Sequence, residues 1–286
     1  MKILLLGGTG LAGAALKREI LNRGMQIRCL ARTGADIDYD LSNPAGLDAI
    51  FKEESPDLII NAAGKVNIKQ CEENYAATAL INTNLCRILD IWAVKSSRKW
   101  VHISTDHFFC TGDGAAHTER DTVQIANAYA KQKFEGEKLA LKNPNTLVVR
   151  TSILGLRKKA NQPSFCESVI AKIKNQEPIT LFHDAWTSSI DTQTFSRAII
   201  DLVEKKACGL INIGSSEVFT KAELIRQMAR HLNIELADSA KGSVKDLRPV
   251  RANCLGLDVS LAQNILGYTF PSLSQVISSV LDKNSV

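Results

Sequence analysis

The chain has 286 residues, of which 45% are hydrophobic and 23% charged, the composition of a globular protein with a substantial core. Its formal net charge of +5 is scattered and forms no basic block, which argues against nucleic-acid binding and suits a small anionic partner. No run reaches the ~18 apolar residues of a spanning helix, so no membrane association is expected. The seven cysteines lack metal-ligand or disulfide spacing; we therefore expect reduced thiols, no metal site and a cytoplasmic protein.

Short apolar segments alternate with helical segments in the first half of the chain, which predicts a parallel sheet covered by helices on both faces. The apolar start runs directly into glycines, so it is interpreted as a first strand and not as a signal peptide. A first helix is expected from Leu11 to Arg23, ended by Gly24, and a second is expected to begin at Asn43-Pro44. The predicted strands are Lys2–Gly7, Gln26–Ala31, Asp57–Asn61, Trp100–Thr105 and Thr146–Thr151.

Beyond Ser152 the loops lengthen and the strands become isolated, at Ile179–Phe182 and Gly209–Gly214. The run Thr220–Glu223 is a capping box that predicts a helix to about Leu232, and short helices are expected near residues 261 and 273. We therefore predict an α/β fold: a Rossmann-type doubly wound parallel sheet with a smaller α/β substrate-binding lobe. The Rossmann domain is placed at 1–152, with 185–215 added to it, and the lobe at 153–184 and 216–286.

A glycine motif follows the first strand and precedes the first helix, with the pattern G-x-x-G-x-x-G. Gly7 permits a tight turn, Gly10 allows a pyrophosphate close to the backbone, and Gly13 lets the helix pack on the strand. The helix N-terminus then offers N–H groups and a partial positive charge to phosphates. A glycine turn without a ligand is the alternative. The residues expected to contact a dinucleotide here are Gly7, Thr9, Gly10, Leu11, Ala12 and Gly13.

The end of the second predicted strand indicates which dinucleotide is bound. NAD-specific sites place an acidic residue there to hold the ribose 2′-hydroxyl. In this chain Arg32 follows Ala31 at that position, and a guanidinium suits a 2′-phosphate. We therefore predict that NADP(H) is preferred, and that residues 1–152 form an NADP(H)-binding domain. The alternative is a solvated Arg32 and a protein that also accepts NAD(H).

Tyr129 and Lys133 form a Y-x-x-x-K pattern, which on a helix places both side chains on one face. A nearby cation lowers the pKa of a phenol, and Tyr129 could then protonate a carbonyl oxygen as hydride arrives. The strand ending in Ser104 and Thr105 lies upstream and supplies a hydroxyl for the same carbonyl. Since successive strand residues face opposite sides, only one of these two hydroxyls can point into the site.

With these motifs in this order, the chain resembles the extended short-chain dehydrogenase/reductase family, and within it the dTDP-4-dehydrorhamnose reductases, over nearly its whole length. The resemblance implies an NAD(P)-dependent oxidoreductase that reduces the keto group of a nucleotide-linked keto-sugar in deoxysugar and polysaccharide precursor synthesis. A homodimer would be ordinary for this fold. The motifs that carry the resemblance are Asp40–Pro44, Asn61–Ala63, Asn82, Ser104–Asp106, Tyr129–Lys133, Gly136-Glu137, Arg150–Ser152, Arg248-Pro249 and Leu257-Asp258.

The resemblance also implies roles for individual residues. Thr105 would be the catalytic hydroxyl, Tyr129 the proton donor and Lys133 its partner, with the latter two and Ser104 also beside the cofactor. The residues implied to lie along the adenine and the cofactor groove are Asp40, Leu41, Ala62, Ala63 and Asn82.

The chain departs from the family on the sugar side. His107 stands where a tyrosine is usual, and Phe108–Cys110 replaces a Val-Phe-Asp-Gly-like run. Asp184 is followed by 185–189, Ala-Trp-Thr-Ser-Ser, where Gly-x-Pro-Thr is typical, so the identity of the sugar does not carry over. The expected substrate contacts are Asp106, His107, Trp186 and Arg248.

Each of these residues could instead have a purely structural role. His107 is equally well a packed strand-end residue, and Trp186 a rim or core residue. Arg248 and Arg251 are the two candidates for a diphosphate clamp, and solvent-facing loop arginines are the alternative. His102 is expected to be a core residue of the sheet, and Thr111–Gly114 a turn.

Two other functions stay open at this point. One is a regulatory or sensor protein that binds NADP(H) without chemistry; the complete catalytic set argues against it, because non-catalytic members tend to lose that set. The other is a nucleotide-sugar epimerase or dehydratase. Epimerases hold NAD tightly, which Arg32 opposes, and no Asp-Glu pair follows Thr105 as a dehydratase requires.

Overall fold

The structure, a computed structural model, describes residues 1–159 and 162–282. The chain forms two compact units: a first unit of residues 1–105, 127–150 and 199–211, and a second unit of residues 106–126, 151–198 and 212–286. The segments 106–126 and 185–198 thus group with the second unit, whereas the sequence placed them with the Rossmann domain. Each unit has its own hydrophobic core.

A seven-stranded sheet, carried mostly by the first unit, has the order β11-β6-β5-β4-β1-β2-β3. Neighbouring strands from β1 to β6 run parallel, which confirms the predicted doubly wound α/β sheet. The chain leaves the central β1 to both sides, so the carboxyl end of β1 is a topological switch point, where such sheets bind ligands. The strands are β1 (Lys2–Leu6), β2 (Gln26–Ala31), β3 (Ile37–Asp38), β4 (Leu58–Asn61), β5 (Lys99–Ile103), β6 (Leu147–Thr151) and β11 (Gly209–Ile213).

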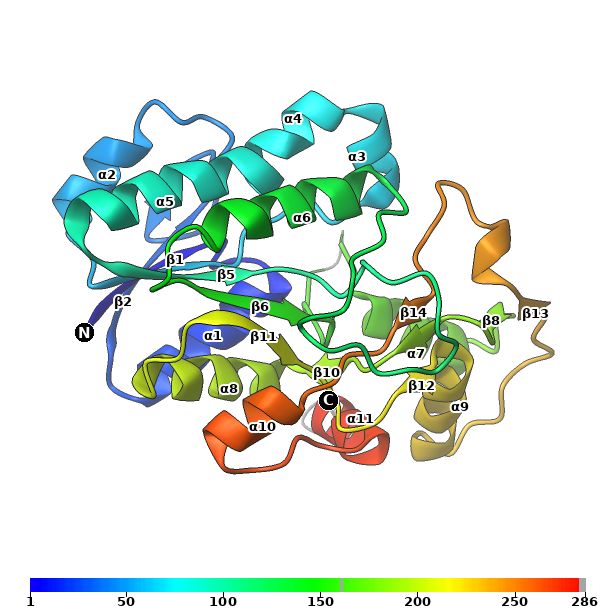
Figure 1. Cartoon of the computed structure of the whole chain (residues 1–286). Helices are drawn as coiled ribbons and strands as arrows, with labels where there is room; N and C mark the ends of the chain where they lie inside the picture. The colour runs from blue at the N-terminus through cyan, green and yellow to red at the C-terminus, as the bar shows by residue number, and fades with distance from the viewer. Residues whose placement is uncertain (160–161, 283–286) are drawn as a thin grey trace. The chain divides into compact units, whose positions relative to one another are not determined.

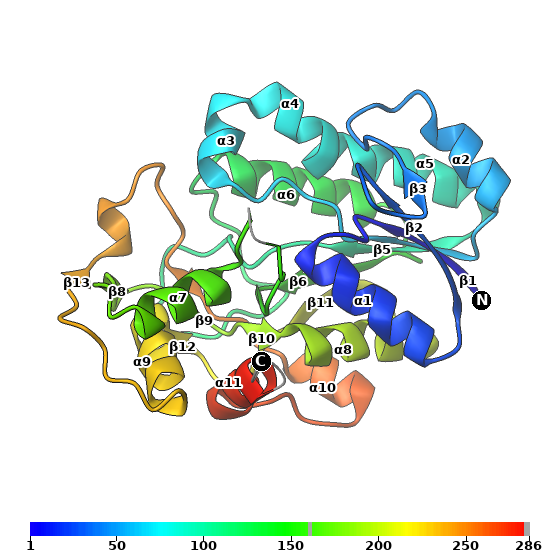
Figure 2. The same ribbon diagram turned by 180° about the vertical axis from the view of Figure 1, so that it is seen from behind.

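Helices cover both faces of this sheet, with α5 and α6 on one face and α1 with the end of α8 on the other (Figures 1 and 2). Arg23, just after α1, pairs with Asp201 at 2.7 Å and with Glu204 at 2.8 Å on the end of α8. The helices are α1 (Leu11–Asn22), α2 (Leu47–Glu54), α3 (Ile68–Glu73), α4 (Tyr75–Ala79), the π-helical turn η1 (Leu80–Asn84), α5 (Leu85–Ser96), α6 (Ala128–Ala140) and α8 (Thr192–Glu204).

The start of α2 corrects one expectation. The helix begins at Leu47, with Gly46 before it, and not at Asn43-Pro44. The Asn43 side chain accepts a hydrogen bond from the Ala45 N–H at 3.1 Å, which closes a local turn instead of capping a helix. By contrast, β2 has its predicted bounds, and α1 ends one residue before the predicted Arg23, with Gly24 at φ 67°.

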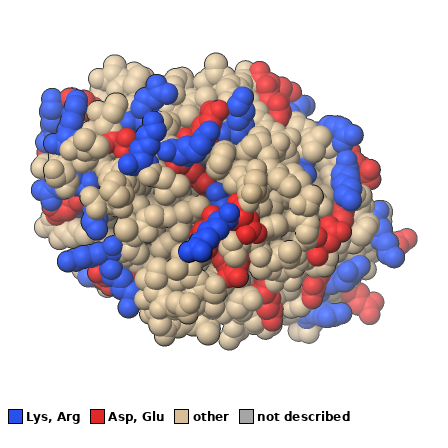
Figure 3. Space-filling model, viewed as in Figure 1, with Lys and Arg blue, Asp and Glu red and all other residues tan. Residues whose placement is uncertain are grey.

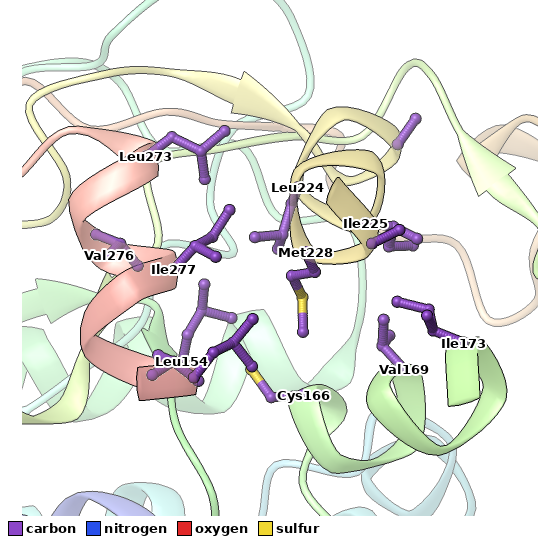
Figure 4. Close-up of a cluster of buried hydrophobic side chains, with 14 of the residues drawn as sticks. Leu154, Cys166, Val169, Ile173, Leu224, Ile225, Met228, Leu273, Val276 and Ile277 are labelled. Carbon is purple, nitrogen blue, oxygen red and sulfur yellow. The ribbon is translucent and has the colours of Figure 1, made fainter. Parts of the chain in front are cut away.

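The second unit packs α7, α9 and α11 around an apolar cluster that includes Leu154, Met228 and Ile277 (Figure 4). Thr220 caps α9 by accepting a hydrogen bond from the Glu223 N–H at 3.1 Å, which is one of the two bonds of the predicted capping box. Its helices are α7 (Phe165–Lys174), α9 (Lys221–His231), the 3-10 turn η2 (Val244–Asp246), α10 (Ser260–Leu266) and α11 (Leu273–Leu281). Its strands are β7 (Ile153–Leu154), β8 (Leu181–Phe182), β9 (Trp186–Thr187), β10 (Ile190–Asp191), β12 (Phe219–Thr220), β13 (Lys241–Gly242) and β14 (Cys254–Leu255).

Charged side chains of both signs are interspersed on the face shown in Figure 3, with no broad field of one sign. Within the described part of the chain, every helix is too short or too polar to cross a membrane.

Candidate active site

The glycine motif forms a turn that only small residues can occupy. Gly7 has φ 79°, and a Cβ there would lie 2.8 Å from the Ala63 nitrogen. A Cβ on Gly13 would lie 2.1 Å from the Gly7 carbonyl oxygen, so this residue lets α1 pack against the turn. Gly10 precedes α1 and provides no side-chain cap for it. The first N–H groups of α1 therefore face a site where a phosphate would complete them, and the cradle fits a dinucleotide.

Gly8, which the motif left as a variable position, is constrained as well. A Cβ there would lie 2.7 Å from the Cys29 side chain on β2. The register aligns Leu6 with Leu30 and Asn61. The carboxyl ends of β1, β2 and β4 therefore meet at one edge of the sheet, around the turn.

The predicted adenine side lies beyond β2. Arg32 is exposed directly after this strand, and Leu41 is buried in the core of the first unit. Hydrogen bonds from Ser42 lower the pKa of Asp40, and the nearby charges of Arg32 and Lys65 lower it further. Arg32 thus lies close to Asp40, together with a second cation, Lys65, that sequence reasoning did not select.

The loop after β4 contains Ala62 and Ala63, which the sequence predicts to lie along the cofactor. Asn82 on η1 is fully buried. Its amide donates to the Lys65 carbonyl at 3.0 Å, and its Oδ1 accepts from the Lys65 N–H at 2.8 Å. A further bond joins Asn82 to Gln132 on α6 at 2.9 Å. Asn82 therefore shapes this loop through the Lys65 backbone, and direct contact with a cofactor stays a prediction.

The residues predicted to be catalytic come from the carboxyl end of β5 and the first turns of α6. Thr105 lies two residues after β5 and is buried, and Ser104 extends the strand pairing through its N–H to the Val149 carbonyl at 2.7 Å. On α6, Tyr129 and Lys133 lie one turn apart and both are buried. The Tyr129 ring packs against α3, on Ile68 and Cys71.

Lys133 links α6 to the end of β5. Its Nζ donates to the Ile103 carbonyl at 2.8 Å and lies 3.2 Å from His102 Nε2. Burial lowers the pKa of Lys133, and Cys86 and Glu137 oppose that shift. The ammonium therefore sits on the strand two residues before Thr105, and it brings the helix face that carries Tyr129 to the end of that strand.

In the second unit, one end of a three-stranded sheet gathers most of the predicted substrate contacts. The order is β12-β9-β14, with Trp186 between Thr220 and Cys254. The Lys221 N–H donates to the Ala185 carbonyl at 2.9 Å, and the Cys254 N–H donates to the Phe109 carbonyl at 3.0 Å. The segment that begins at Asp106 and the residues before β14 therefore meet at the same end of this sheet as Trp186 and Lys221.

Charge distinguishes the two candidate arginines. Burial, together with the charges of Lys221 and Arg251, lowers the pKa of His107 to about 3, so this imidazole is neutral at pH 7. Burial also lowers the pKa of Lys221, which Asp106 opposes. Arg248 and Arg251 are both exposed, and Arg248 donates to the carbonyls of Lys245 and Leu247 at 2.8 and 2.9 Å. The charge of Arg251 acts on both His107 and Lys221, and a substrate contact from Arg248 stays a prediction.

Two residues at these sites were outside the sequence-based selection, Lys221 and Lys65. Each is brought to its site by pairing between distant segments of the chain. The position of Lys221 directly after a helix cap was the one local sequence feature that could have indicated either residue. His102 is a buried residue of β5, as expected, and it also contacts Lys133. Residues 1–159 and 162–282 contain no cluster of three or more metal-ligating side chains.

Comparison with known proteins agrees with this geometry. The family model described as the RmlD substrate binding domain matches residues 1–263. A dTDP-4-dehydrorhamnose reductase of Salmonella typhimurium is 27% identical over 246 residues, covering 83% of this chain and 81% of the relative. A dTDP-6-deoxy-L-talose 4-dehydrogenase (NAD(P)(+)) of Kitasatospora kifunensis is 26% identical over 302 residues, covering 94% and 90%.

A solved structure extends the comparison to the whole fold. The dTDP-4-dehydrorhamnose reductase of Bacillus anthracis, in complex with NADP, superposes with a TM-score of 0.88 at 19% identity and covers 99% of both chains. At this identity the likeness concerns the fold. Because the family model spans almost the entire chain, the protein belongs to the RmlD substrate-binding-domain family.

Proposed function

We propose that the protein is an NADPH-dependent reductase of a keto group on a nucleotide-linked 4-keto-6-deoxy sugar, acting in deoxysugar and polysaccharide precursor synthesis. The observation that carries the proposal is the anchoring of Lys133 on the end of β5, which unites the Thr105 strand end with the Tyr129 helix face. The reductase and dehydrogenase relatives support this reaction class.

The residues present divide the reaction between them. The glycine turn and the N-terminus of α1 would hold the pyrophosphate of the dinucleotide, which supplies hydride when bound. Thr105 would donate a hydrogen bond to the substrate carbonyl, and Tyr129 would give its phenolic proton to the same oxygen as the carbon is reduced. The ammonium of Lys133 stabilises the phenolate that remains.

The cluster in the second unit supports an anionic substrate. We assign Lys221 and Arg251 to a substrate phosphate, since ammonium and guanidinium groups are the usual phosphate partners. Trp186 offers a ring for a sugar or base, and a neutral His107 offers a hydrogen bond without charge. Asp106, which belongs to this cluster, directly follows the proposed catalytic Thr105 in the chain. The homodimer and a contact from Arg248 stay predictions.

Arg32→Ala is expected to weaken NADPH binding by about tenfold to a hundredfold, the usual worth of a charge-assisted hydrogen bond. NADH affinity should stay within about twofold, because NADH lacks the 2′-phosphate. Fluorescence titration of both cofactors against wild type and variant measures the effect, and NADH serves as the internal control. Equal losses of affinity for both cofactors would mean that Arg32 does not bind the 2′-phosphate. Such a result would favour a protein that also accepts NAD(H).

Arg251→Met and Lys221→Met are each expected to raise KM for the nucleotide-sugar by about tenfold or more, with a smaller change in kcat and none in NADPH affinity. Arg226→Met is the matched control, since Arg226 lies on the same helix as Lys221 and lines a separate hollow with Ala229 and Asn233. Steady-state kinetics over substrate concentration gives both constants. A rise in KM confined to Arg248→Met would reverse the assignment.

The function itself is tested by following NADPH absorbance. The purified protein is mixed with NADPH and a panel of nucleotide-linked 4-keto-6-deoxy sugars made in situ. Consumption that requires one of these sugars supports the proposal. Tight NADPH binding without consumption on any of them would instead favour a regulatory protein.

A further inference from the structure

A small polar cluster lies beneath Lys133, inside the core of the first unit. His102 on β5 is 1% exposed. Its Nε2 lies 3.2 Å from Lys133 Nζ, and its Nδ1 lies 3.3 Å from Asn61 Nδ2 and 3.6 Å from Cys86 Sγ. Buried polar groups are costly unless they are hydrogen-bonded, so each contact of this imidazole bears on the charge and position of its neighbours.

The protonation of His102 follows from its surroundings. Burial and then the charge of Lys133 lower the pKa of His102 well below its ordinary value, so the ring is neutral. A neutral imidazole has one acceptor nitrogen, for which the Lys133 ammonium and the Asn61 amide compete. The charge-assisted bond is the stronger, so Nε2 accepts from Lys133 and Nδ1 carries the proton. Nδ1 then faces Cys86, whose thiol stays protonated because burial raises its pKa to about 12.

The ammonium of Lys133 has three N–H groups. One donates to the Ile103 carbonyl at 2.8 Å and a second to His102. Both acceptors belong to β5, in the core of the first unit. Together they determine the direction of the third N–H. The third N–H is the one that remains for a bound cofactor or for the Tyr129 side of the site.

We propose that His102 is a positioning residue for Lys133, which fixes the direction of its ammonium and stabilises its charged form. The kinetic consequence rests on the proposed reductase function, whereas the effect on Lys133 itself does not.

Other polar groups also lie around the pair of Lys133 and His102. From α6, Glu137 faces Lys133, but it is bound by Arg150 on β6 at 2.9 Å, which offsets its charge. Among the described residues, the Cys86 thiol faces the imidazole from α5 and the uncharged Asn61 faces it from β4. Within residues 1–159 and 162–282, His102 is thus the side chain that accepts from Lys133 Nζ.

Two isosteric amides separate positioning from packing. The carboxamide of His102→Gln reaches the place of Nε2, whereas that of His102→Asn reaches only the place of Nδ1. NMR of protein labelled with ¹³C-lysine gives the pKa of Lys133 in the cofactor-free chain, with the resonance assigned from Lys133→Met. In His102→Asn this pKa should fall by about one to two units, because the charged form loses a charge-assisted acceptor. His102→Gln should keep the wild-type value.

Cys86→Ala is the comparison variant, since it removes the thiol that lies 3.6 and 3.7 Å from the two ring nitrogens; because this thiol stays protonated, the Lys133 pKa should change by less than in His102→Asn. Thermal unfolding of each variant shows that it is folded. An unchanged Lys133 pKa in folded His102→Asn, or the same fall in both amide variants, overturns the proposal.

The kinetic arm follows the pH dependence of NADPH-driven keto-sugar reduction. The alkaline limb of kcat/KM should move to lower pH in His102→Asn by the shift that NMR measures, and return in His102→Gln. A merely structural histidine would lower thermal stability and kcat without moving this limb. If NMR shows the shift but no keto-sugar is reduced, the positioning role stands and the proposed reaction fails.

Discussion

Tyr129→Phe is expected to lower kcat for keto-sugar reduction by about a hundredfold to ten-thousandfold, the usual contribution of a positioned general acid. The variant loses the phenolic hydroxyl, which carries the proton, and keeps the aromatic ring. The ring keeps its packing on Ile68 and Cys71, so the fold and NADPH affinity should be unchanged. Single-turnover kinetics with saturating NADPH measures the loss without interference from product release.

Tyr75→Phe provides the matched control for this prediction. Tyr75 lies on α4 and is 38% exposed, so removal of its hydroxyl should leave kcat within about twofold of wild type. Turnover of Tyr129→Phe near the wild-type rate would remove Tyr129 from its role, and the proton would then have to come from another group or from water.

Gly13→Ala is expected to raise the dissociation constant for NADPH by about tenfold to a hundredfold and to lower thermal stability. The added Cβ would lie 2.1 Å from the Gly7 carbonyl oxygen and 2.8 Å from the Gly8 Cα. Both are backbone atoms of the same turn, so α1 must move away from it, at a cost of about 1–3 kcal/mol for an overpacked site. The helix N-terminus that faces the pyrophosphate moves with it.

Gly64→Ala is the matched control, because it adds a methyl group near the proposed cofactor site without displacing α1. A Cβ at this position would meet Asn82 Oδ1 at 3.6 Å, an ordinary contact, so affinity and melting temperature should stay close to wild type. Calorimetric titration with NADPH and thermal unfolding of the free protein measure both quantities. Wild-type affinity in Gly13→Ala would show that the cradle does not hold the dinucleotide.

The sequence correctly predicted those elements that are determined by residues close together in the chain. β2 has its predicted bounds because an apolar run and flanking turn residues define it. Thr220 caps α9 because the hydroxyl and the N–H that it accepts are three residues apart. The predicted start of α2 was wrong because the Asn43 side chain closes a turn with its own neighbours. This conformation competes with helix capping.

The rest of the site depends on contacts between distant segments. The segment 106–126 belongs to the second unit because Phe109 pairs with Cys254 and His117 with Leu257. Neither pairing leaves a periodic signal in the sequence. Likewise, the neighbourhood of Lys221, Arg251 and Asp106 comes from strand order in a three-stranded sheet. Sequence reasoning therefore found the glycine turn and the Y-x-x-x-K helix, whereas the effect of the Arg251 charge on His107 and Lys221 became evident only in the structure.

The most direct test of the account is transfer of deuterium from deuterated NADPH to the sugar. The enzyme is incubated with NADPH deuterated at nicotinamide C4 on one face at a time, together with a nucleotide-linked 4-keto-6-deoxy sugar, and the product is analysed by mass spectrometry and NMR. Hydride reduction of the keto group predicts one deuterium on the former carbonyl carbon from one of the two labelled cofactors, and labelling with Tyr129→Phe that is slower by about a hundredfold or more. A reduced sugar without deuterium from either cofactor, or no reduced sugar despite bound NADPH, would contradict the central claim.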